Sequence, residues 1–180
     1  MLDWERIDKI QGWLFKEEGY RLYELAKEAR GPIVEIGSFE GRSTACLGSG
    51  ARDGFDYPVF AVDPHQGSVL TDRNTLDPFL HNMKSMGLTI YPMVMTSAEA
   101  AQRIEGSVHM VFIDGDHEEA MARQDAMLWL PHLGTGSLMA FHDYGHENWP
   151  GVQVVVDEFV HAGILKWHDF TRSLAVMEVC

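Results

Sequence analysis

The sequence has few cysteines, few basic residues and no long hydrophobic run. Only Cys46 and Cys180 occur among 180 residues, so we expect no disulfide framework and a reducing, cytoplasmic environment. Lys and Arg total 14 against 27 Asp and Glu, a net charge of −13, which argues against a nucleic-acid partner. No segment has the length and apolarity of a membrane span or a secretory signal. These absences favour a cytoplasmic protein that binds neither membranes nor nucleic acid.

The composition is typical of a globular domain, with 46% apolar and 23% charged residues. We expect a single domain over residues 1–180. Within it, residues 1–31 form an N-terminal helical cap and residues 32–180 form the core. Helices are predicted at Asp3–Gln11 and Glu17–Arg30, the second ending at Gly-Pro.

Short apolar segments alternate with helical patterns through the first five predicted strands. Such alternation predicts a doubly wound α/β sheet with right-handed crossovers and helices on both faces. A very short Thr-Arg-Ser turn joins the last two strands, which predicts an antiparallel hairpin at the end. The predicted strands are Ile33–Ile36, Pro58–Asp63, Thr89–Met95, Val108–Ile113, Ser137–Phe141, Ile164–Phe170 and Leu174–Val179.

The first predicted strand runs into a glycine turn and then into a helix of small residues. The dinucleotide fingerprint G-x-G-x-x-G is absent, and the pattern from Glu35 to Gly41 is instead E-x-G-x-x-x-G. Gly37 and Gly41 allow the backbone to approach a ligand, and the following helix start attracts an anionic group. The pattern therefore indicates a ligand cradle, although a glycine after a strand also serves as a plain tight turn.

Polar residues follow the carboxyl ends of the predicted strands. Doubly wound sheets bind ligands at this edge, near the switch in strand order. An acid after the second strand, here Asp63, suits ribose hydroxyls, and a turn or helix-cap role is an equal alternative. The residues at this edge are Gly37, Asp63, Ser97, Asp114, His142 and Asp143.

Four stretches carry a resemblance to a known family: GWLFKEEGYRLYELA, IVEIGSFEGRST, the segment from VFIDGDHEEA to the Gly-Ser turn, and LMAFHDY followed by WPGV. Together they resemble class I S-adenosylmethionine-dependent methyltransferases. More narrowly, they resemble the small-molecule O-methyltransferases related to cephalosporin and macrolide biosynthesis enzymes. The resemblance implies a Rossmann-like sheet of seven strands whose last strand is antiparallel. It also implies methyl transfer from S-adenosylmethionine to a small-molecule acceptor.

The resemblance assigns cofactor roles to residues along the same edge. Glu35, Gly37, Ser38 and Gly41 would surround the methionine part of the cofactor, and Asp63 would bind the ribose. Asp114 would lie near the transferring methyl group. The adenine would be bordered by Thr96, Ser97 and Ala98; Ser97 is also a candidate helix cap.

The activation of the acceptor has two alternatives. In metal-dependent relatives, acids at the ends of the fourth and fifth strands hold a divalent cation such as Mg²⁺ or Mn²⁺. The matching residues are Asp114, His142 and Asp143, although relatives usually carry a carboxylate where this chain has His142. Without a metal, His117 or His142 would act as the general base. The predicted catalytic residues are therefore Asp114, His117 and His142. His142 and Asp143 could also simply cap the loop.

The sequence is compatible with more than one role for several features. Trp13 and Phe15 are expected either to cover the cofactor or to pack in the core. A nucleotide- or NAD-binding protein and a non-catalytic methyltransferase-fold protein are the competing functions. Residues 68–75 and 145–149 are expected to shape an acceptor pocket, but nothing local distinguishes a sugar, a phenol or a carboxylate. A homo-oligomer is also compatible with the sequence.

Overall fold

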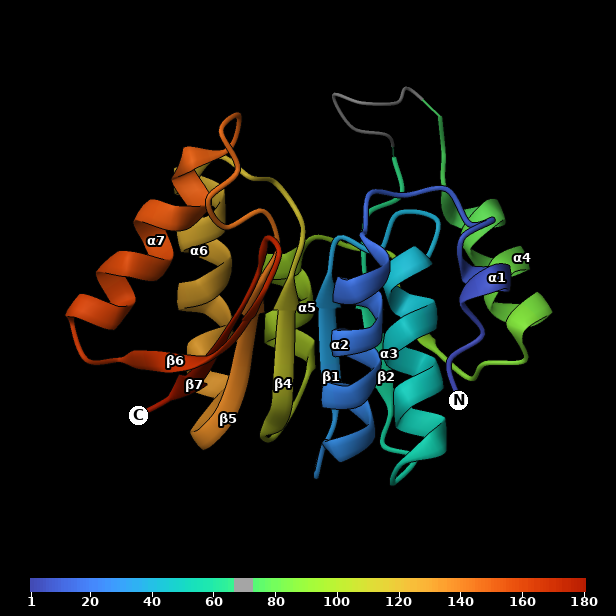
Figure 1. The fold of residues 1–180 in the computed structure, drawn as a ribbon, viewed down its shortest axis with the longest axis horizontal. Helices are drawn as coiled ribbons and strands as arrows, with labels where there is room; N and C mark the ends of the chain where they lie inside the picture. Colours follow the sequence, from blue (N-terminus) through green and yellow to red (C-terminus); the bar gives the residue numbers. More distant parts are fainter. Residues whose placement is uncertain (67–72) are drawn as a thin grey trace.

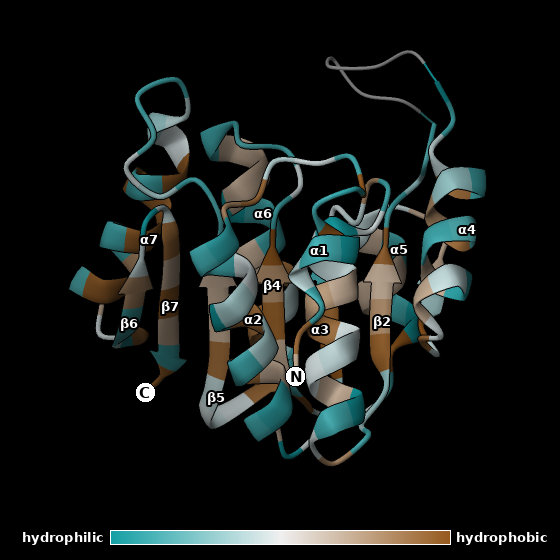
Figure 2. Ribbon diagram, turned by 45° about the vertical axis from the view of Figure 1, so that its right-hand side comes forward, coloured by the Kyte–Doolittle hydropathy of each residue, from teal (hydrophilic) through white to brown (hydrophobic). Residues whose placement is uncertain are grey.

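A seven-stranded sheet forms the centre of the computed structural model, which describes residues 1–66 and 73–180 (Figure 1). The strand order is β3-β2-β1-β4-β5-β7-β6. Strands β1 to β5 pair in parallel, whereas β7 is antiparallel to both of its neighbours, and Figure 2 shows it running against β2 and β4. This topology confirms the predicted fold. The strands are β1 (Ile33–Ile36), β2 (Val59–Val62), β3 (Tyr91–Met93), β4 (Val108–Ile113), β5 (Leu133–Phe141), β6 (Leu165–Thr171) and β7 (Leu174–Val179).

Helices cover both faces of the sheet, because successive residues of each buried strand point to opposite sides. Ile33 belongs to one buried cluster and its neighbour Val34 to the other. On the first face lie α1 (Trp4–Ile7), α2 (Lys16–Glu28), α3 (Arg42–Asp53) and α4 (Leu76–Met86). On the second lie α5 (Ser97–Arg103), α6 (Glu119–Trp129) and α7 (Pro150–His161), with a 3₁₀ turn, η1 (Leu130–His132), leading into β5.

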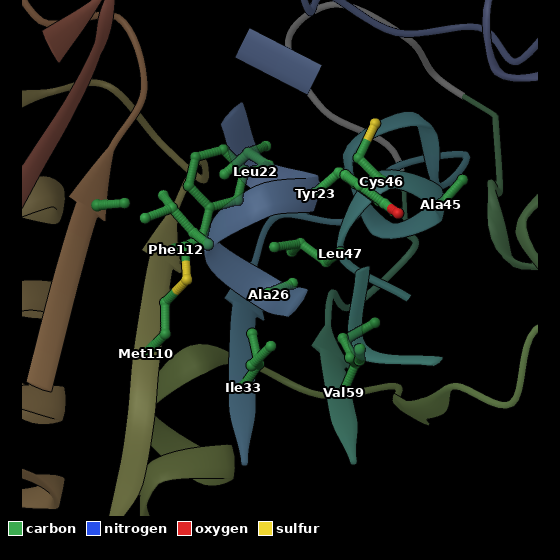
Figure 3. Close-up of a cluster of buried hydrophobic side chains, with 14 of the residues drawn as sticks. Leu22, Tyr23, Ala26, Ile33, Ala45, Cys46, Leu47, Val59, Met110 and Phe112 are labelled. Atoms are coloured by element: carbon green, nitrogen blue, oxygen red, sulfur yellow. The ribbon is translucent and has the colours of Figure 1, made fainter. Parts of the chain in front are cut away.

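The core of the first face lies between α2, α3 and the strands β1, β2 and β4 (Figure 3). Leu22 from α2 and Leu47 from α3 are fully buried against Ile33 and Phe112 of the strands. The small residues of α3 let α2 approach closely. A Cβ atom on Gly50 would lie 2.2 Å from the carbonyl oxygen of Tyr23. This tight packing holds α3, and with it the turn after β1, in a defined position.

Element boundaries differ from the prediction at several ends. The helix predicted at Asp3–Gln11 is only one turn, α1, which Asp3 caps by accepting a hydrogen bond from the Arg6 amide. Strand β3 is shorter than the predicted Thr89–Met95, and β5 begins four residues before Ser137. The glycines at the start of β5 have no side chain, so the pattern of apolar residues did not indicate a strand there. Among the described residues, every helix is too short or too polar to cross a membrane.

Candidate active site

Glu35 lies near the end of β1 and is fully buried. Its carboxyl group accepts hydrogen bonds from the hydroxyls of Ser43, at 2.5 Å, and Thr44, both at the start of α3. Burial raises the pKa of Glu35 to about 8; the two hydroxyls oppose this rise, and the nearby acids Asp114 and Asp63 add to it. The site therefore contains a carboxyl group that is largely protonated at neutral pH.

The turn after β1 approaches β4 too closely for any side chain. Gly37 has φ +87°, and a Cβ atom there would lie 2.2 Å from the carbonyl oxygen of Asp114. Gly41, at φ +93°, precedes α3, and its Cβ would lie 2.5 Å from Met83 Cε. Between them, the hydroxyl of Ser38 is buried and has no hydrogen-bond partner among the described residues. A buried hydroxyl without a partner is costly, so this loop is shaped for a polar ligand.

Asp63 follows β2 and reaches toward the same turn. Its Oδ2 accepts a hydrogen bond of 2.8 Å from the Phe39 amide, and its Oδ1 accepts one of 2.7 Å from the His65 amide. Each carboxylate oxygen can accept a second bond, so capacity for a ligand remains. His65 is buried with Nδ1 2.8 Å from Thr75 Oγ1, and burial lowers its pKa.

The residues predicted near the adenine lie at the start of α5. Thr96 is the helix N-cap and forms a capping box with Glu99. The predicted cap, Ser97, has another role: its hydroxyl accepts a hydrogen bond of 2.9 Å from Trp129 Nε1. Ala98 is half-buried beside it. Among these three, the Ser97 hydroxyl is thus already engaged in the packing of α5 against α6.

The ends of β4 and β5 bring four titratable side chains together. His142 is buried, with Nδ1 3.1 Å from Asp114 Oδ1 and 3.6 Å from Asp143 Oδ2. Its Nε2 lies 3.2 Å from Oε2 of Glu18, which α2 contributes. His117 Nδ1 lies 3.4 Å from Asp143 Oδ2.

The surroundings of His142 decide its protonation. Burial alone would lower the pKa of His142, but the charge of Asp114 and hydrogen bonds to Asp114, Asp143 and Glu18 outweigh it and raise that pKa well above its usual value. Both ring nitrogens of His142 face carboxylates, an arrangement that favours the protonated ring. A general base needs a ring nitrogen within reach of the acceptor, and both nitrogens of His142 already contact carboxylates of the protein.

The structure also contains a group of possible metal ligands that includes His117. Asp114, His117 and Asp143 each offer one ligand atom, and these atoms lie within 4.8 Å of one another. The predicted set had His142 in place of His117. His142 has its Nε2 against the buried Glu18, whereas His117 is half-buried and packs beside Trp149, with ring centroids 5.1 Å apart. The role of the set as metal ligands stays a prediction.

The segment between α1 and α2 is tied to the start of α3. The Arg42 guanidinium donates hydrogen bonds to the carbonyl oxygens of Asp8 (2.7 Å), Ile10 (2.8 Å) and Leu14 (3.5 Å). This holds Trp13 against Phe39 in the turn after β1, with ring centroids 5.4 Å apart. Trp13 and Phe15 are 60% and 55% exposed, so the expectation that they pack in the core is wrong.

Comparison with known proteins decides the family. A family model described as a methyltransferase domain matches residues 34–144, which include the turn after β1 and the ends of β2, β4 and β5. The chain belongs to this methyltransferase family. The match spans most of the residues that line the carboxyl edge of the sheet.

Solved structures share the fold of this methyltransferase at low sequence identity. The O-methyltransferase from Bacillus cereus in complex with SAH matches at a TM-score of 0.77 and 14% identity, covering 97% of this chain and 90% of the other. Cofactor-bound Rv0187 from MTB matches at 0.76 and 16%, covering 98% and 87%. TomG from Streptomyces achromogenes, in complex with SAM, matches at 0.69 and 14%, covering 93% and 81%. These matches establish the fold.

Two residues that contact the candidate site were not predicted from the sequence. Glu18 and Arg42 read as ordinary charged helix residues, yet Glu18 is fully buried and Arg42 bridges segments more than 25 residues apart. Only Glu18 had a possible sequence signal. A Glu at the third position of a helix often accepts a hydrogen bond from the N-cap amide, and Glu18 accepts one from Phe15. Most of the predicted acceptor loop at 68–75 lies outside the described residues.

Proposed function

We propose that this methyltransferase uses S-adenosylmethionine to methylate an oxygen atom of a small-molecule acceptor. The observation that carries the proposal is the turn after β1. It combines the side-chain-free approach of Gly37, the partnerless hydroxyl of Ser38 and the acceptor capacity of Asp63. The absent dinucleotide fingerprint and the terminal hairpin favour this cofactor over NAD. The structures from Bacillus cereus and Streptomyces achromogenes that share this fold are complexes with SAH and SAM.

The residues of the site fit such a cofactor. Its methionine portion would lie against Gly37, Ser38 and Gly41, and its ribose hydroxyls would donate to Asp63. Thr96 to Ala98 would border the adenine. When bound, the cofactor supplies an activated methyl group. The tie between Arg42 and the front segment would place Trp13 over this region and exclude water.

The test is cofactor affinity. Calorimetry with adenosylhomocysteine should show binding to the wild type, and Asp63→Ala should weaken it at least tenfold, because charge-assisted hydrogen bonds contribute about 1.5–3 kcal/mol each. NAD should not bind. Equal affinity of the wild type and Asp63→Ala for adenosylhomocysteine would show that Asp63 does not bind the cofactor. Transfer of labelled methyl to a panel of a catechol, a hydroxycinnamate and a sugar would then test the reaction.

For the acceptor proton, we propose that His117 rather than His142 is the functional histidine. With Nδ1 beside Asp143 Oδ2, its other ring nitrogen can take a proton from an acceptor hydroxyl. Alternatively, His117 would complete a divalent-cation site with Asp114 and Asp143, and the two carboxylates suit Mg²⁺ or Mn²⁺. Exhaustive chelation followed by addition of Mg²⁺ or Mn²⁺ separates these cases. Full activity in chelator, with Asp114→Asn still active, would leave the His117 base.

We also propose a cytoplasmic location and a single domain over residues 1–180, with residues 1–31 as its cap. The net charge of −13 supports a small-molecule partner rather than nucleic acid. Fractionation of a tagged protein checks the location. Limited proteolysis checks the domain, since a separate cap would be released from the rest of the chain. Light scattering measures whether the chain forms a homo-oligomer.

A further inference from the structure

Glu18 connects three segments that are distant in the sequence. It lies in the first turn of α2, and its carboxylate is fully buried. Its Oε1 accepts hydrogen bonds from the amide (3.0 Å) and the hydroxyl (2.7 Å) of Ser173, in the turn between β6 and β7. Its Oε2 accepts from the Phe15 amide at 3.0 Å and lies 3.2 Å from His142 Nε2. Because β7 is antiparallel to β5, this turn meets the carboxyl end of β5 (Figure 1).

The contact with His142 extends this arrangement to the site. Nε2 of the imidazole faces Glu18, and Nδ1 on the other side of the ring faces Asp114 and Asp143. The ring edge packs against Phe112, with centroids 6.3 Å apart. A ring held at both nitrogens cannot rotate freely. The orientation of the Asp114 and Asp143 carboxylates therefore depends on a residue that touches neither of them.

A buried carboxylate is a costly way to cap a helix or anchor a turn. Uncharged side chains would do both without the loss of hydration that a buried charge incurs. The neighbouring Glu17 shows the cheaper solution: it is exposed and pairs with Arg172 of the same turn, at 3.1 and 3.2 Å. The burial of Glu18 against His142 thus needs a reason beyond attachment of the hairpin.

We propose that Glu18 is a positioning residue which, through His142, holds Asp114 and Asp143 in the orientation that the reaction requires. Its catalytic consequence rests on the proposed methyl transfer, whereas the linkage itself does not. The role holds whether Asp143 orients a His117 base or Asp114 and Asp143 bind a cation. In both cases the carboxylates of Asp114 and Asp143 must be held close together and point toward the same group.

The primary test measures linkage through stability and needs no substrate. Urea unfolding is compared for the wild type, Glu18→Gln, Asp114→Asn and the double variant. If His142 joins the two carboxylates, the shifts in unfolding midpoint are non-additive, although Glu18 and Asp114 do not touch. Glu17→Gln with Asp114→Asn is the matched control and should be additive. Additive shifts in the Glu18 cycle would overturn the proposal.

The second test measures catalysis with labelled S-adenosylmethionine and the best acceptor of the panel. Glu18→Gln should lower kcat by about tenfold or more, as the loss of an orienting partner does elsewhere, while adenosylhomocysteine affinity stays within about twofold. In a His142→Ala background, Glu18→Gln should cause no further loss. A folded Glu18→Gln protein with wild-type kcat would refute the catalytic role. If no acceptor is methylated by the wild type, the proposed function fails, and the stability cycle still decides the linkage.

Discussion

The protonation of Glu35 makes a quantitative prediction about stability. In the folded protein its pKa is raised from 4.5 to about 8, chiefly by burial. Between these two values the unfolded chain has released the proton and the folded chain retains it. The unfolded state then binds fewer protons, so stability falls as pH rises through this window and levels off above about pH 8. At about 1.4 kcal/mol per pH unit, the full effect is about 5 kcal/mol.

Glu35→Gln removes this titration and keeps the size of the side chain. Free energies of unfolding in urea, measured at pH 5.5 and 8.5, should show the wild type losing about 3 kcal/mol relative to Glu35→Gln over this interval. The comparison between the two proteins cancels the titration of other groups. Glu24→Gln, at an exposed position on α2, is the control for removal of a carboxylate. Parallel pH dependences for the wild type and Glu35→Gln would show that Glu35 titrates alike in both states and refute the reasoning.

The turn after β1 and its tie to the front segment give the remaining predictions. Gly37→Ala should abolish adenosylhomocysteine binding in calorimetry and lower the melting temperature, because its Cβ would meet the Asp114 carbonyl at 2.2 Å. Gly136→Ala is the control, because Gly136 also has a positive φ, +84°, but a Cβ atom there would meet nothing within 4 Å. Unchanged binding in Gly37→Ala would contradict the crowding argument. Arg42→Ala should speed amide hydrogen exchange across residues 8–15 and weaken cofactor affinity, since three carbonyl oxygens lose their donor. Unchanged exchange there, as expected for exposed Arg52→Ala, would show that other contacts hold the segment.

The alternation of short apolar strands with helices was sufficient to predict the sheet and its terminal hairpin. The ends of the strands were harder to predict. Thr89 and Ile90 are β-branched and were expected in the third strand, but β3 begins only at Tyr91, because pairing with β2 decides where the strand starts. Local periodicity contains no information about the partner strand. The same applies to Trp13, whose apolar character suggested burial although the structure leaves it largely exposed on Phe39.

For the candidate site, the sequence located the edge but not the pairing of its side chains. The ends of parallel strands meet at one edge, so Asp63, Asp114 and His142 could be placed together from order alone. Which carboxylate faces which nitrogen depends on residues from outside these strands. Glu18 lies 124 residues before His142, and no spacing rule connects them. Consequently the chain order could not distinguish His142 from His117 as the base or the metal ligand.

The carboxyl groups at this edge of the sheet differ in burial and in the groups that they contact. Burial raises the pKa of Glu35, whereas Glu18 is equally buried but faces His142, and its pKa is lowered despite burial. The side chains of Asp114 and Asp143 are 18% and 15% exposed, and that of Asp63 is 18% exposed, so these carboxylates are accessible from outside. The ring of His142 lies between the buried Glu18 and the carboxylates of Asp114 and Asp143. In a chain with a net charge of −13, His142 is thus a basic side chain that contacts all three of Glu18, Asp114 and Asp143.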